Sequence, residues 1–195
     1  MYQLHPLGLQ EHWIYEVLIS TYRRETPHAA PMGVWTDGAD ELSMDMYNGS
    51  QTLATILDGG HFVVNFPTGV QTLYVALRAP EELAFAPAHL VHAPVVAGCT
   101  ATVELALSRA TPGVDRVRIV GDVRRVVVDG APRLINRAEG LLLESLVLVT
   151  RLDRRDPAAA LTTLTENLRV ARKVAPASAY ESAIAALLRD LAPSS

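Results

Sequence analysis

Hydroxyl side chains occur in two pairs early in the chain, and these are the residues best suited to bind an anion. Ser20 and Thr21 end an apolar run, and Ser50 and Thr52 follow an Asn-Gly pair. An Asn-Gly turn followed by serine predicts a capped helix that begins after Ser50 and ends at the glycine pair 59–60. Free amides at a helix start bind phosphate well, although a simply capped helix has the same pattern. The candidate phosphate ligands are Ser20, Thr21, Ser50, Gln51 and Thr52, with Arg23 or Arg24 as weaker candidates.

Small residues follow the first hydroxyl pair, in the stretch 28–34. Two alanines and a proline next to glycine leave the backbone bare, so that a flat ligand can lie close to the main chain. An ordinary hairpin with a tight interior has the same composition. We therefore treat as candidate ring contacts His28, Ala29, Ala30, Pro31 and Met32, with Asn65 from a later strand. His28 has an unperturbed pKa near neutrality and could donate a proton. We interpret it first as a residue that lines the site, and only second as a proton donor.

Six apolar or alternating segments are expected to form the strands that position these residues. Asp37-Gly38 marks a turn between the second and third of them, and Gly121 suits a bulge or bend. The run 70–77 fits a helix or a short strand, and the proline-rich segment 79–98 is expected to be irregular. Six strands suffice for a small Greek-key barrel. They cover 13–22, 28–36, 41–47, 61–66, 100–107 and 116–128.

The last third of the chain has helical periodicity. Residues 136–151 are apolar nearly all round and predict a buried helix, inside which Glu144 would need an arginine partner. Asp156-Pro157 predicts the start of a second helix, which Pro176 ends. Ser178 and Glu181 have the spacing of a capping box for a third helix. The last two form a helical hairpin, whose apolar stripes must pack on each other, on the barrel or on a partner.

Composition narrows the class of protein. The chain has 195 residues, 49% hydrophobic residues and a net charge of -4, which argues against general nucleic-acid binding. Cys99 is the only cysteine, so an intrachain disulfide is excluded. His89 and His92 lie in a proline-interrupted segment without a third ligand, so no metal site is expected. No run suits a signal peptide or a membrane span, and we expect a cytoplasmic protein.

The order of these motifs resembles the FMN-binding split-barrel superfamily, the flavin reductase and pyridoxamine-phosphate oxidase-like proteins. Within it, the chain resembles the uncharacterised DUF447 family. The similarity covers most of the chain, and the motifs occur in the same order as in that family. The matching segments are 19–21, 29–33, 49–52, 62–65, 135–138, Glu144 and 150–152.

The resemblance implies a mainly β fold with α (α+β), a six-stranded Greek-key FMN-binding split barrel with a C-terminal helical hairpin. Residues 1–132 would form the flavin-binding barrel, and residues 133–195 a helical region packed on the barrel or on a dimer partner. The implied cofactor is FMN, and FAD fits less well because no second nucleotide fingerprint is present. A homodimer with the flavin near the subunit boundary is also implied.

Two function classes remain open from the sequence. The first is an FMN-dependent oxidoreductase acting on a small molecule, with a pterin or related one-carbon carrier as the class that the family's setting suggests. The second is a non-catalytic flavin-binding carrier, sensor or assembly protein. A weaker alternative keeps the barrel and replaces the ligand by a deazaflavin or haem. No residue stands out as a catalytic acid or base.

Overall fold

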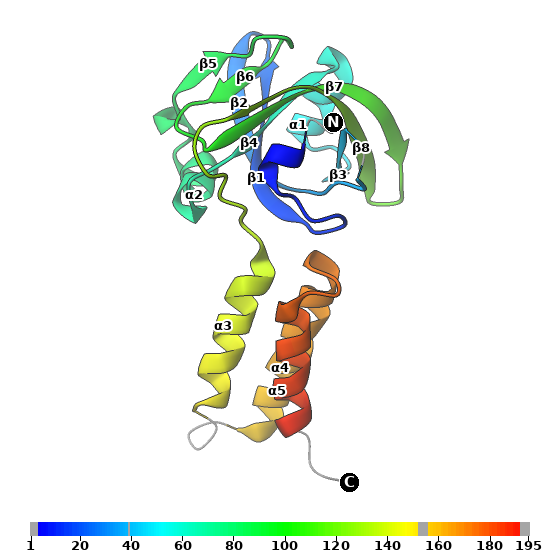
Figure 1. Cartoon of the computed structure of the whole chain (residues 1–195). Coiled ribbons are helices and arrows are strands. Elements are labelled where there is room, and N and C mark those ends of the chain that lie inside the picture. The colour runs from blue at the N-terminus through cyan, green and yellow to red at the C-terminus, as the bar shows by residue number, and fades with distance from the viewer. Residues whose placement is uncertain (1–3, 39, 152–155, 192–195) are drawn as a thin grey trace. The chain divides into compact units, whose positions relative to one another are not determined.

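The computed structural model describes residues 4–38, 40–151 and 156–191, so Leu152 of the last matching segment lies outside them. The chain divides into two compact units (Figure 1). The barrel unit contains the described residues up to Glu11 and those from Tyr15 to Ile135, and the helical unit contains His12–Ile14 and the described residues from Asn136 onward. No helix in the described ranges is long and apolar enough to cross a membrane.

The barrel unit is built on an antiparallel sheet of six strands in the order β2-β1-β4-β7-β8-β3. The predicted strands are all confirmed, although β2 buries only Ala29 and Val34, because its small and polar residues do not form a continuous apolar face. Their bounds are β1 Tyr15–Arg23, β2 Thr26–Val34, β3 Glu41–Tyr47, β4 His61–Phe66, β7 Ala101–Pro112 and β8 Arg116–Val128.

The sheet curls until its two edge strands meet. Trp35, just after β2, and Ser43 of β3 form a bridge, in which each backbone amide donates to the other residue's carbonyl with N to O distances of 3.0 and 2.8 Å. The register of β7 and β8 shifts directly after the pair Leu107–Gly121, where the sequence predicts a bulge. Inside the barrel, a Cβ atom on Gly121 would lie 2.5 Å from the Phe62 ring. Glycine is thus required here by close packing inside the barrel.

Two helices and a small hairpin complete the barrel unit. Helix α1, Gln51–Gly59, begins after Ser50 and ends at Gly60 with φ 67°, as predicted. The ambiguous run after residue 69 is helix α2, Val70–Arg78. The segment 79–98 is less irregular than expected, because it contains a short 3₁₀ turn and a hairpin of β5, Phe85–Pro87, and β6, Pro94–Val96. Each of these strands has only three residues and a proline, which hides it from pattern analysis.

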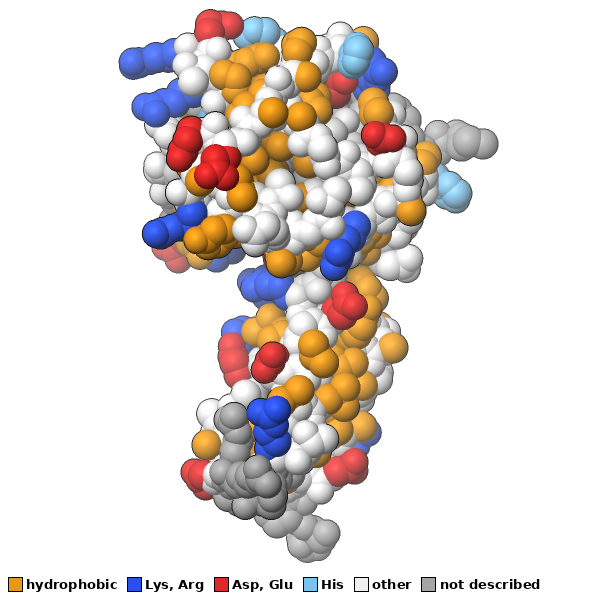
Figure 2. Space-filling view, turned by 90° about the vertical axis from the view of Figure 1, so that its left-hand side faces the viewer, with side chains coloured by type: hydrophobic (Ala, Val, Ile, Leu, Met, Phe, Trp, Pro, Cys, Tyr) orange, Lys and Arg blue, Asp and Glu red, His pale blue; other side chains and the backbone are white. Residues whose placement is uncertain are grey.

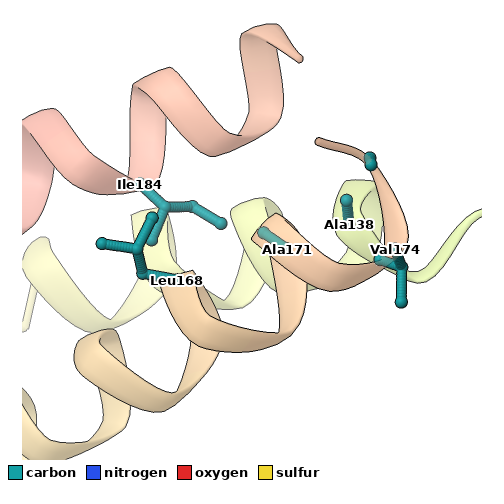
Figure 3. Close-up of a cluster of buried hydrophobic side chains, with 6 residues drawn as sticks. Ala138, Leu168, Ala171, Val174 and Ile184 are labelled. Atoms are coloured by element: carbon teal, nitrogen blue, oxygen red, sulfur yellow. The ribbon is translucent and has the colours of Figure 1, made fainter. Parts of the chain in front are cut away.

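The helical unit consists of α3 Arg137–Val149, α4 Pro157–Val174 and α5 Ala179–Leu191. Both predicted caps are present: Asp156 accepts a hydrogen bond from the Ala158 amide, and Ser178 accepts one from the Glu181 amide. Side chains from all three helices meet in a buried cluster (Figure 3). Its buried members are Ala138, Leu168, Ala171, Val174, Ala175 and Ile184.

The prediction that residues 136–151 form a helix buried on all sides is wrong. In α3, Leu143 and Leu146 are 60% and 46% exposed, and Glu144 is also exposed. Glu144 therefore needs no arginine partner, because water solvates its carboxylate. Figure 2 shows hydrophobic side chains gathered along the surface of the helical unit. The apolar residues of α3 thus lie on both its buried face and its exposed face.

Candidate functional site

Strand alternation divides the candidate residues between two faces of the β1–β2 pair. Residues opposite each other in an antiparallel pair point to the same face, and successive residues point to opposite faces. Thr21 pairs with His28, and Ser20 pairs with Ala29. His28 contacts α1, whereas Ala29 packs against α2 and β6. The α1 face therefore carries Thr21, His28, Ala30 and Met32, and the opposite face carries Ser20, Ala29, Pro31 and Asn65.

On the face opposite α1, Ser20 and Asn65 form a fully buried hydrogen-bond network. The side-chain amide nitrogen of Asn65 donates to the Leu18 carbonyl at 3.1 Å and to the Ser20 hydroxyl at 2.8 Å. Its carbonyl oxygen accepts from the Val96 amide at 2.9 Å, and the Ser20 hydroxyl donates to the Pro94 carbonyl. These bonds fix β6 to β1 and β4, and they engage both side chains within the protein.

The N-terminus of α1 presents backbone donors. Ser50 caps the helix by accepting a hydrogen bond from the Leu53 amide at 3.3 Å. No acceptor among the described residues is bonded to the amides of Gln51 and Thr52, because the first turn of a helix has no intrahelical partners for them. Gln51 is exposed, Ser50 half-buried and Thr52 buried. The helix start therefore combines two free amides with the hydroxyls of Ser50 and Thr52.

The site contains a buried polar atom whose hydrogen bond is unmade, the hydroxyl oxygen of Thr21. Thr21 is fully buried, and its Oγ1 is the one buried side-chain oxygen or nitrogen in the described part of the chain without a hydrogen-bond partner. It lies on the same face as His28, whose Nε2 is 3.2 Å from the Thr52 Oγ1 at the α1 start. An unpaired buried hydroxyl costs about 1–3 kcal/mol, so such a group in a native protein indicates a missing partner.

Positive charge approaches this site from the end of β1. Burial lowers the pKa of His28 below its usual value, and the nearby Arg23 guanidinium lowers this pKa further. His28 is therefore neutral at pH 7 in the protein without ligand. Arg24 lies in the two-residue turn between β1 and β2, where it and Glu25 have φ of 46° and 65°. Of the two arginines named by the sequence, Arg23 is the one whose charge reaches the site.

The residues Ala30, Pro31 and Met32 are half-buried on β2, while Ala29 is buried beneath α2. The small residues of this stretch therefore do not form one continuous platform. Ala30 and Met32 are accessible on the α1 face, in line with His28. Cys99 packs against the apolar cluster around Ala29, and burial raises the pKa of its thiol to about 11.

Sequence reasoning missed Glu104, a β7 residue that is 1% exposed. Its carboxylate accepts hydrogen bonds from the backbone amides of His89 and Leu90, the latter at 2.6 Å. These bonds hold the loop between β5 and β6 in place. An acidic residue inside an otherwise apolar strand was the available signal, since a buried carboxylate requires partners.

Several solved structures share this fold. An FMN-bound DUF447 protein from Methanosarcina mazei is 19% identical, with a TM-score of 0.57, covering 97% of this chain and 100% of that chain. Flavoredoxin of Desulfovibrio vulgaris is 19% identical (TM-score 0.52; 62% of this chain, 76% of that chain). Nitrilotriacetate monooxygenase component B from Mycobacterium thermoresistibile is 16% identical (TM-score 0.54; 70% and 80%). These similarities establish that the chain has the split-barrel fold of these proteins.

The sequence itself also matches a family model. The model is described as the N-terminal domain of a protein of unknown function, DUF447, and it matches residues 15–121. The match spans more than half of the chain and includes β1, β2, β3, α1 and β4, the elements that carry the candidate site. The chain therefore belongs to the DUF447 family.

Proposed function

We propose that the protein binds FMN, with the phosphate at the N-terminus of α1. The observation that carries this proposal is the unpaired, fully buried hydroxyl of Thr21 on the face where His28 meets Thr52. A phosphate oxygen next to Thr21 would accept the hydrogen bond that the protein leaves unmade. The FMN-bound and FMN-binding proteins that share the fold support FMN as the source of that phosphate.

The donors around the site fit a phosphate in number and charge. The Gln51 and Thr52 amides supply two hydrogen bonds, and the hydroxyls of Thr21, Ser50 and Thr52 supply further donors. Arg23 adds a positive charge close to His28. Hydrogen bonds to charged groups contribute about 1.5–3 kcal/mol each, so a few of them suffice for selective phosphate binding. The protein would accordingly bind FMN far more tightly than riboflavin.

The flavin ring would contact Ala30 and Met32, which share the accessible face with His28. Ala29 and Pro31 would support the ring site from the opposite face of β2. Ser20 and Asn65 would act through their network, which fixes the position of β1 beside the site. In this arrangement the small side chain of Ala30 leaves room for a planar group against the strand backbone.

We further propose an oxidoreductase that acts on a small planar molecule, with a pterin as the class suggested by the sequence resemblance. FMN supplies hydride and electron transfer when bound, and the protein binds, orients and shields it. Two proteins that share the fold support this reading: an NADH:FAD oxidoreductase from Streptomyces globisporus and the nitrilotriacetate monooxygenase component B. The alternative is a non-catalytic flavin-binding carrier, sensor or assembly protein.

Three measurements test these proposals, first for the cofactor and then for the reaction. The purified protein should show the visible absorption of an oxidised flavin, and mass spectrometry of the released ligand should identify FMN. The holoprotein is then reduced anaerobically with NADH or NADPH, and candidate acceptors are added while the visible spectrum is followed. Nicotinamide-dependent reduction with reoxidation by an acceptor faster than by oxygen would support the enzyme. If neither nicotinamide reduces the flavin and no acceptor reoxidises it faster than oxygen, the non-catalytic role is favoured.

A homodimer with the flavin near the subunit boundary is the assembly we propose, and the outer side of α2 offers an exposed apolar face for it. The inner side of α2 packs on Leu18 and Ala29, whereas Val70, Tyr74 and Leu77 on its outer side are 66%, 59% and 70% exposed. The spacing of these three residues places them on one helix face, and a second copy is the occupant we propose for it.

Replacing Leu77 by glutamate is expected to convert the dimer into a monomer, because a carboxylate would be desolvated at the interface. Light scattering measures the mass directly. The matched control is Val114→Glu, since Val114 is 93% exposed in the turn between β7 and β8. A wild-type protein that is monomeric with flavin bound would contradict the dimer, as would equal effects of the two substitutions.

A further inference from the structure

His28 has a geometry that sets it apart from the other donors of the phosphate site. Its Nε2 lies 3.2 Å from Thr52 Oγ1, so its ring reaches the start of α1 from the strand opposite Thr21. The other donors on this face are backbone amides and hydroxyls, whose charge does not change with pH. His28 alone among them can gain a positive charge near neutrality.

We propose that His28 recognises the charge of the phosphate and makes FMN binding proton-coupled, so that each bound dianion brings one proton to the His28 ring. This inference rests on the proposed FMN site. In the ligand-free protein the ring is neutral and shares a hydrogen bond with Thr52. A phosphate dianion at the α1 start favours the imidazolium, because an opposite charge within a few ångströms stabilises the charged form.

The charged residues around His28 do not stabilise its protonated form, so that only the bound phosphate would do so. Arg23 of β1 is the charged residue that acts on the ring, and it opposes protonation. The one charged residue of α1 is Asp58, about 9 Å from Thr52 along the helix axis. Helix α2, with Arg78, packs on the opposite face of β2, and β3, with Glu41 and Asp45, meets the far end of β2. No carboxylate of these elements therefore lies at the ring to stabilise its charge in place of the ligand.

The direction of the pH dependence follows from the two protonation states. The pKa of free His28 is lowered by burial and by Arg23, and the dianion raises the pKa in the complex. Binding takes up a proton at every pH between these two values. The dissociation constant of FMN therefore increases as pH rises through this window, by at most tenfold per pH unit, and becomes constant above it. Riboflavin, which has no phosphate, should bind with no such dependence.

The test compares wild-type protein with His28→Gln, whose side chain keeps a hydrogen-bonding group without the titration. FMN and riboflavin are titrated by fluorescence between pH 6.5 and 9, above the second pKa of about 6 typical of phosphate monoesters. Calorimetry at pH 7 in two buffers of different ionisation enthalpy then counts the protons. Thermal melts confirm that the variant is folded. We expect proton uptake on FMN binding in wild type, none in His28→Gln, and a pH-independent dissociation constant for the variant.

Two results would overturn the inference in distinguishable ways. If wild type and His28→Gln bind FMN with the same proton count and the same pH profile, His28 does not titrate with the ligand, while the phosphate site itself stands. If FMN and riboflavin bind equally tightly at every pH, the protein does not recognise the phosphate. The second result would remove the proposed site together with the role of His28.

Discussion

Replacing Thr21 by valine should make the ligand-free protein more stable and its FMN complex weaker. Valine has nearly the shape of threonine, and the Thr21 hydroxyl is fully buried without a partner. Removing it should raise the free energy of unfolding by about 1 kcal/mol, because the cost of an unsatisfied buried group disappears. The loss of a charged hydrogen bond should weaken FMN binding about 10- to 150-fold, which corresponds to about 1.5–3 kcal/mol. Denaturant unfolding and flavin fluorescence measure the two effects.

The neighbouring hydroxyl provides the control. The Ser20 hydroxyl donates to the Pro94 carbonyl and accepts a hydrogen bond from Asn65 at 2.8 Å. Ser20→Ala should therefore lower the free energy of unfolding by about 1–3 kcal/mol, the opposite sign to Thr21→Val. If Thr21→Val destabilised the ligand-free protein as much as Ser20→Ala does, Thr21 would have a structural partner, and the argument for a missing ligand there would fail.

Adding a methyl group at Gly121 should lower the free energy of unfolding, because the barrel interior leaves no room for it. The new Cβ would lie 2.5 Å from Phe62 Cζ and 3.0 Å from Leu105 Cδ2, both inside the barrel. Overpacking of this kind costs about 1–3 kcal/mol, because the ring must leave its preferred position. Gly59→Ala is the matched control in the same unit, since its Cβ meets no atom within 4 Å. It should stabilise α1 by about 0.5 kcal/mol. Denaturant unfolding reports both.

The clash can be assigned to Phe62 by a double substitution. Phe62→Leu shortens the ring side chain, so Gly121→Ala should cost less in that background than in wild type. An equal cost in both backgrounds would show that the strain arises elsewhere, for example in the backbone of β8. A Gly121→Ala protein as stable as wild type would contradict the packing described for the barrel interior.

The strands and the capped helices were predictable because their signals are local. The alternation within β7 and β8, the short apolar runs of the other strands, the Ser50 cap of α1 and the Asp156 cap of α4 all depend on neighbouring residues. The hairpin of β5 and β6 was not predictable, because distant groups hold it in place. Val96 donates to Asn65, and the connecting loop donates to Glu104. Such tertiary contacts override the irregular, proline-rich composition of the segment.

The candidate site was predictable in part for a similar reason. The sequence does not distinguish the neighbouring hydroxyls of Ser20 and Thr21. They point to opposite faces of β1, so that Ser20 bonds to β6 while the Thr21 hydroxyl has no partner. The same alternation separates Ala29 from Ala30. The exposure of Leu143 on α3 was hidden because an apolar run does not indicate which of its faces meets the core. The candidate residues could therefore be identified from composition, whereas the face of the β1–β2 pair on which each of them lies is known only from the strand register.

The account rests on a phosphate site at the start of α1, and Thr52→Val tests it most directly. Thr52 is 5% exposed, so valine fills the same space and removes only the hydroxyl next to His28. Binding of FMN and of riboflavin is measured for wild type and variant under identical conditions. We predict that the substitution weakens FMN about 10- to 150-fold, in line with about 1.5–3 kcal/mol for a charged hydrogen bond, and leaves riboflavin nearly unchanged. Equal losses for both flavins would place the phosphate elsewhere and contradict the proposed site.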